Sequence, residues 1–81
     1  MAVASGTTPL KQFRLDLGVG RKKLSQEKLA RAAGTSLQTI RSAESGEEIY
    51  LSTASSIWKA LNAERKSRGL PKVSFEQLWS L

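Results

Sequence analysis

The side chains that could do chemistry in this chain are amides, guanidinium groups, hydroxyls and carboxylates. The 81 residues include no cysteine and no histidine, so disulfides and thiolate metal sites are excluded, and the commonest general base and metal ligand is missing. We therefore expect no enzyme activity, no metal and no cofactor. The side chains of Gln38 and Arg41 can each form two hydrogen bonds to a single partner, and their spacing places them on one face of a helix.

The charge balance indicates an acidic partner. Thirteen Lys and Arg residues oppose seven Asp and Glu residues, which gives a net charge of +6, and nucleic acid is the first candidate for such a chain. No apolar run approaches the ~20 residues of a membrane span, and no expected helix has the form that binds a membrane surface. Because residues 1–8 also lack the features of a signal peptide, a cytoplasmic protein with no membrane partner is expected.

These polar side chains must be positioned by short helices. The pattern predicts an all-α fold, a compact bundle of about five short helices over residues 9–81, preceded by a flexible arm over residues 1–8. No strand pattern and no internal repeat is visible. In the first helix, Thr8 is the expected N-cap before Pro9, Gly18 and Gly20 are expected to end it, and its apolar stripe consists of Leu10, Phe13 and Leu17.

The second half of the chain predicts two further helices joined by a charged connection. Ser52 is the expected cap of the first of them, whose inner face would carry Ala54, Ile57, Trp58 and Leu61. Residues 65–72 are expected to form the connection. Ser74 and Gln77 then form a capping box, flanked by Val73 and Leu78 as a hydrophobic staple, which predicts a terminal helix over about 74–81.

The segment from about 25 to 46 has the spacing of two helices that meet steeply through a short turn. Ser25 can cap a helix over 26–33, and Gly34 tolerates the positive φ that the turn requires. A second helix starts at Thr35 or Ser36 and ends near Gly46. The inner face is supplied by the small or branched apolar residues Leu29, Ala30, Ala33, Ile40 and Ala43.

Three runs in this segment, residues 24–30 (LSQEKLA), 34–36 (GTS) and 44–46 (ESG), resemble the lambda-repressor-like family of DNA-binding domains, the Cro/CI or Xre-like type. The resemblance implies that the recognition helix, residues 36–45, lies in the major groove of double-stranded DNA. The residues that it would direct to base edges are Ser36, Leu37, Gln38, Arg41 and Ser42.

Several of these residues have a competing structural interpretation. Gln38 can bind adenine with two hydrogen bonds, or it can close a capping box with Thr35. Arg41 can bind guanine, or it can bind a phosphate or form a salt bridge with Glu44 or Glu48. Leu37 either contacts a thymine methyl group or joins the core.

Phosphate contacts are expected from Gln26, as the resemblance implies, and from the cations Lys22, Lys23 and Lys28. The loop after the recognition helix contains Glu47 and Glu48, which would repel the DNA backbone, although Tyr50 could still contact it. The resemblance also suggests that Arg14 braces the domain by pairing with Glu44; alternatively, its guanidinium is free.

The leading hypothesis is a transcriptional regulator that represses by occupying an operator and is therefore associated with the nucleoid. One alternative is an antitoxin with a toxin partner, which Trp58 and Trp79 could contact if they were exposed. Another is a protein-interaction adaptor that has lost DNA binding, which the acidic residues 44–48 favour. A homodimer on a palindromic site is expected, and its seam is one role for the apolar residues of the last helix; the other is closure of the core. These residues are Phe75, Leu78, Trp79 and Leu81.

Overall fold

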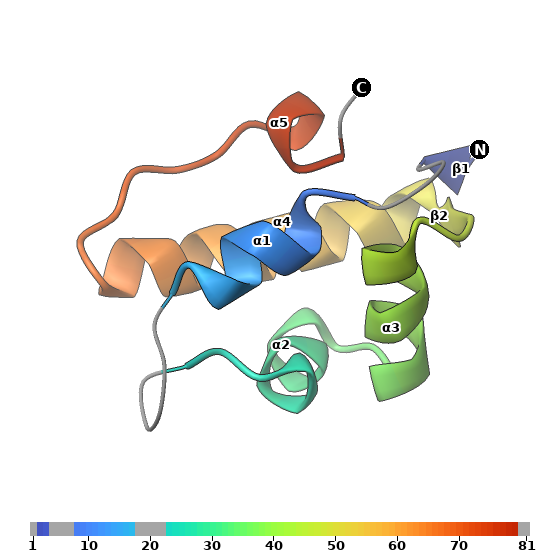
Figure 1. Cartoon of the computed structure of the whole chain (residues 1–81), viewed down its shortest axis with the longest axis horizontal. Coiled ribbons are helices and arrows are strands. Elements are labelled where there is room, and N and C mark those ends of the chain that lie inside the picture. The colour runs from blue at the N-terminus through green and yellow to red at the C-terminus, as the bar shows by residue number, and fades with distance from the viewer. Residues whose placement is uncertain (1, 4–7, 18–22, 80–81) are drawn as a thin grey trace.

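The computed structural model describes residues 2–3, 8–17 and 23–79 (Figure 1). Over these residues the chain is all-α apart from one very small sheet, so the predicted fold class is confirmed. The elements are β1 (Ala2–Val3), α1 (Leu10–Leu15), α2 (Gln26–Ala33), α3 (Leu37–Ser45), β2 (Ile49–Tyr50), α4 (Leu51–Ser67) and α5 (Phe75–Trp79).

Helix α4 is the element on which the domain is assembled. Figure 1 shows it crossing the molecule, with α2 and α3 on one side and α5 on the opposite side. Helix α2 packs against both α3 and α4, and α1 packs against α3 and α5. Burial of Ala54, Ile57 and Leu61, which are fully inaccessible to solvent, confirms most of the predicted inner face of α4, while Trp58 is half-buried at its edge. Apart from α4, the helices are too short to be stable alone, so this shared core holds them in place.

A short antiparallel sheet involves part of the predicted N-terminal arm. Ala2 pairs with Tyr50, and Val3 pairs with Ile49. The prediction that the chain contains no strand was therefore wrong at these four residues. Two-residue strands are too short to show the alternation of apolar and polar residues by which strands are recognised. The rest of the predicted arm at residues 1 and 4–7 lies outside the described residues.

The start of α1 differs from the prediction. Thr8 does not cap this helix; its buried hydroxyl donates a hydrogen bond of 2.7 Å to the carbonyl oxygen of Ala43, and Pro9 occupies the N-cap position without a side-chain cap. A buried hydroxyl needs a partner, and the end of α3 supplies one. The apolar residues predicted for the first helix do face the core, since Leu10 and Leu17 are buried and Phe13 packs against it, but Leu17 lies two residues beyond the end of α1. The helix ends at Leu15; Gly18 and Gly20 lie outside the described residues.

Helix α4 is longer than predicted at both ends. It begins at Leu51, so Ser52 lies inside the helix and is not its cap. It continues to Ser67, three residues into the predicted connection. The extension is held by Arg68, which pairs with Glu64 at 2.9 Å and donates to the carbonyl oxygen of Leu17, two residues after α1. An i,i+4 pair of this kind supports helix formation.

The terminal helix α5 closes the core within the same chain. Its predicted capping box is confirmed, because Ser74 Oγ accepts from the backbone N–H of Gln77 and Gln77 Oε1 accepts from that of Ser74. Leu78 and Trp79 are 0% and 2% exposed, so these two side chains are not available as a dimer seam. Phe75 is half-buried against Trp58, and Leu81 lies outside the described residues.

Candidate nucleic-acid interface

The turn between α2 and α3 is built by the residues predicted for it. Ser25 Oγ accepts a hydrogen bond of 3.1 Å from the backbone N–H of Lys28 and so caps α2. Gly34 ends that helix in the left-handed region, at φ 69°, where a side chain would be strained. The backbone N–H groups of Gly34 and Thr35 satisfy the carbonyl oxygens of Arg31 and Ala30. The helix boundaries and the turn predicted from sequence are therefore confirmed.

Helix α3 is fixed at its start by Ser36, whose Oγ accepts from the backbone N–H of Thr39 at 3.1 Å and lies 2.8 Å from Thr39 Oγ1. Its inner side carries Ile40 and Ala43, which are fully buried. They complete a core with Leu29 and Ala30 of α2. One side of α3 is thus committed to packing, and the other side faces solvent.

A buried ionic cluster joins α1, α2 and α3. Arg14 donates to both carboxylate oxygens of Glu44, at 2.5 and 3.1 Å, and also to the carbonyl oxygen of Leu24. Gln26 Nε2 donates to Glu44 Oε1 at 3.0 Å. The predicted brace between Arg14 and Glu44 is therefore confirmed. The carboxylate of Glu44 is therefore 5% exposed, and Arg14 compensates its negative charge inside the domain.

The exposed side of α3 carries the two side chains predicted to bind bases by paired hydrogen bonds. Gln38 and Arg41 are both exposed. Gln38 does not close a capping box with Thr35, because the N-cap of α3 is Ser36. Arg41 does not pair with Glu44 or Glu48 in the described part of the chain, where the ion pairs are Arg14–Glu44 and Glu64–Arg68. The capping-box interpretation of Gln38 and the salt-bridge interpretation of Arg41 are thus contradicted, while a phosphate contact of Arg41 stays a prediction.

The remaining predicted base-contacting residues are less free. Ser36 is exposed, but its hydroxyl is used by the cap and by Thr39. Leu37 and Ser42 are half-buried, and Leu37 is not part of the core cluster. These residues therefore flank the surface formed by Gln38 and Arg41.

The predicted phosphate contacts are spread around the same helix pair. Lys23, Lys28 and Tyr50 are exposed, with Tyr50 at 78%. Gln26 is half-buried and bonded to Glu44, while Lys22 lies outside the described residues. Glu47 and Glu48 are exposed as well, so they are the part of the acidic segment that still faces solvent.

Sequence reasoning gave no role to the lysines of α4 and of the following loop. Lys59, Lys66 and Lys72 are exposed and line a groove on a part of the domain that contains no residue of α2 or α3. The spacing of Lys59, Ala63 and Lys66 places them on one helical face, and this shared face is the sequence feature that could have indicated the groove.

Among residues 2–3, 8–17 and 23–79, no three acidic side chains come close enough together to hold a metal ion. Within the same ranges, no helix combines the length and apolar character needed to cross a bilayer.

The chain matches the model of a known protein family. The helix-turn-helix family model HTH_3 matches residues 10–64, a range that contains α1, α2, α3 and most of α4. No curated protein and no solved structure matches the chain.

Proposed function

Because the chain belongs to the Cro/CI-type helix-turn-helix family of DNA-binding domains, we propose that it is a sequence-specific transcriptional regulator that binds double-stranded DNA through α3. The observation that carries this proposal is the division of α3 into two sides. Ile40 and Ala43 anchor one side in the core, while Gln38 and Arg41 project from the other without a partner among the described residues. Repression by occupying an operator is the mode that the family resemblance favours.

In this proposal, α3 enters the major groove and its exposed residues bind base edges. Gln38 forms two hydrogen bonds to an adenine and Arg41 forms two to a guanine. The exposed part of Leu37 contacts a thymine methyl group. Ser36 and Ser42 contribute single hydrogen bonds at the margins of this surface.

The ionic cluster also prepares a phosphate contact. The amide of Gln26 has two N–H bonds, and one of them is directed to Glu44 Oε1. The second N–H is free to bind a phosphate oxygen at the N-terminus of α2, where the helix dipole favours negative charge. Lys23, Lys28 and Tyr50 add contacts to the DNA backbone. These contacts position the domain and carry no sequence information.

A homodimer on a palindromic site is part of the proposal, because one recognition helix covers only a half-site of a few base pairs. The dimer seam is formed by surface other than the buried side chains Leu78 and Trp79 of α5. Contact of Trp79 with a toxin receives no support, because this side chain is 2% exposed; Trp58 is half-buried.

The alternative of an adaptor without DNA binding depended on the acidic segment at residues 44–48. Glu44 no longer supports it, because this carboxylate accepts hydrogen bonds from Arg14 and Gln26 inside the domain. Glu47 and Glu48 remain, and they lie beyond the C-terminal end of α3. The exposed side of α3 itself carries an amide and a cation, which suits DNA better than an acidic surface would.

The proposal is tested by measuring duplex affinity by fluorescence anisotropy between about 50 and 200 mM salt. For DNA binding, the logarithm of the association constant should fall linearly with the logarithm of the salt concentration, by about 0.9 per phosphate contact. The double variant Gln38→Ala with Arg41→Ala is compared with Lys11→Ala, which removes the same charge from α1. A salt-independent affinity, or equal behaviour of the two variants on every sequence, would contradict the proposal.

A further inference from the structure

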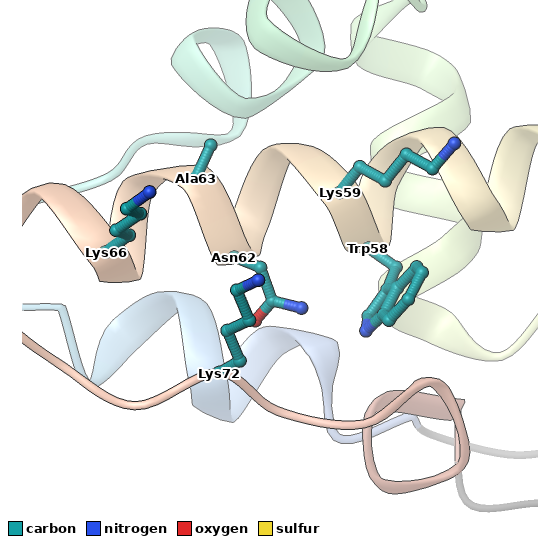
Figure 2. A pocket seen from close by; sticks show the side chains of 6 residues that line it. All are labelled: Trp58, Lys59, Asn62, Ala63, Lys66 and Lys72. Carbon is teal, nitrogen blue, oxygen red and sulfur yellow. The ribbon is translucent and has the colours of Figure 1, made fainter.

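A groove of about 340 Å³ runs along α4 beside the loop that leads to α5. Figure 2 shows Trp58 and Asn62 extending from α4 toward this loop, which carries Lys72. The other lining residues, Lys59, Ala63 and Lys66, also belong to α4. No residue of α2 or α3 takes part, so the groove is separate from the surface proposed to bind DNA.

The floor of the groove is held rigidly and its polar groups are already used. The indole N–H of Trp58 and the amide of Asn62 both donate to the carbonyl oxygen of Val73, at 2.8 and 3.0 Å. Asn62 Oδ1 accepts from the backbone N–H of Val73 at 2.9 Å. With these groups satisfied, the floor offers the ring of Trp58, which favours an apolar side chain.

The rim of the groove is positively charged. Lys59, Lys66 and Lys72 are exposed, and none of them pairs with a carboxylate in the described part of the chain. Glu64, the carboxylate nearest in sequence to Lys66, is paired with Arg68. No acidic residue lines the groove. Three cations therefore surround an apolar floor, and this arrangement is complementary to a segment that combines carboxylates with an apolar side chain.

We propose that this groove binds an acidic peptide segment of a partner protein, with one apolar or aromatic side chain on Trp58 and with carboxylates facing the three lysines. A peptide fits better than a second DNA duplex, because the phosphates of a duplex could reach the lysines but no part of its backbone would cover the apolar floor. Since α3 stays accessible, the domain could hold this partner while bound to DNA.

The test is selection of a phage-displayed library of random 12-residue peptides against the full chain. The expected result is enrichment of peptides with two or more Asp or Glu residues beside an apolar residue. A synthetic peptide of the enriched sequence is then titrated into isotope-labelled protein and should shift the indole N–H signal of Trp58. Absence of enrichment, or enrichment of peptides whose binding leaves this signal unchanged, would overturn the proposal.

Variants with matched charge distinguish the groove from general attraction. Lys59→Glu reverses an exposed cation on the groove, and Lys11→Glu reverses one on α1. Lys59→Glu combined with Lys72→Glu should weaken the peptide about tenfold because two attractions become repulsions. The matched control, Lys11→Glu combined with Arg31→Glu, reverses two exposed cations outside the groove and should change the affinity less than twofold. Equal losses would overturn the proposal, as would an unchanged affinity when the apolar residue of the peptide is replaced by Ser.

Duplex DNA and a stability measurement complete the design. A random-sequence duplex that displaces the peptide and shifts the Trp58 signal would assign the groove to nucleic acid and overturn the proposal. Unfolding by urea shows whether each variant is folded.

Lys59 and Lys72 lie outside the α2–α3 pair, so the variant with both Lys59→Glu and Lys72→Glu should prefer the same DNA sequence as the wild type. A negative result with the peptide would therefore not contradict the proposed regulator function.

Discussion

The two sides of α3 differ in how completely their side chains are used. On the inner side, Ile40 and Ala43 are fully buried and Glu44 accepts hydrogen bonds from two other elements. On the outer side, Gln38 and Arg41 are exposed and have no partner among the described residues. The inner side fixes where the helix lies, and the outer side is left free for a ligand. Substitutions on the two sides should therefore separate stability from DNA binding.

The largest effect is expected for Glu44→Ala on the inner side. This substitution leaves the buried guanidinium of Arg14 without its carboxylate, and an unpaired buried charge costs about 3–5 kcal/mol. Such a loss is comparable to the total stability of a small domain. Urea unfolding followed by circular dichroism measures it. The control is Glu47→Ala, an exposed acid nearby, which should change stability by about 0.5 kcal/mol or less; equal effects would contradict the role of the buried cluster.

The next effect concerns the outer side. Gln38→Ala and Arg41→Ala should each reduce discrimination between the preferred base and the others by about 1–3 kcal/mol, while the free energy of unfolding changes by about 0.5 kcal/mol or less. Competition binding with duplexes that differ at one base pair measures this. If either variant kept the full base preference of the wild type, that residue would not be a base contact.

Gln26→Ala tests a residue of α2 that both bonds to the buried carboxylate of Glu44 and is proposed to contact DNA phosphate. Loss of its hydrogen bond to Glu44 should lower stability by about 0.5–1.5 kcal/mol. Loss of the phosphate contact should weaken binding evenly across sequences. Unfolding and anisotropy measurements on the same protein separate the two effects. A change in base preference would show that Gln26 reads sequence, contrary to the account.

The smallest change in stability is expected for Lys23→Ala combined with Lys28→Ala, because both side chains are exposed. Affinity should fall for all sequences, and the salt slope should become shallower by about one for each contact that is lost. Anisotropy titrations at several salt concentrations check this. An unchanged slope would remove both lysines from the interface.

Local signals in the sequence predicted most of the domain. The caps at Ser25 and Ser74 and the breaks at Gly34 and Gly46 depend on residues close to them in the chain, and each is present in the structure. The Arg14–Glu44 pair was predicted only through the family resemblance, since nothing in its spacing requires it.

The features that were missed depend on contacts between distant segments. The hydroxyl of Thr8 was expected to cap α1, but the fold brings the carbonyl oxygen of Ala43 beside it. The β1–β2 pairing and the bonds of Asn62 to Val73 likewise need the tertiary fold. The same holds for Glu44, which was counted with the exposed acids although packing places it inside the domain.

The most direct test of the central claim is selection of DNA from a random duplex library by the wild-type chain and by Gln38→Ala, followed by sequencing. We expect a palindromic consensus for the wild type and the loss of preference at one position in each half-site for the variant. Failure to enrich any sequence, or an identical consensus for the two proteins, would contradict the claim that the exposed side of α3 reads DNA.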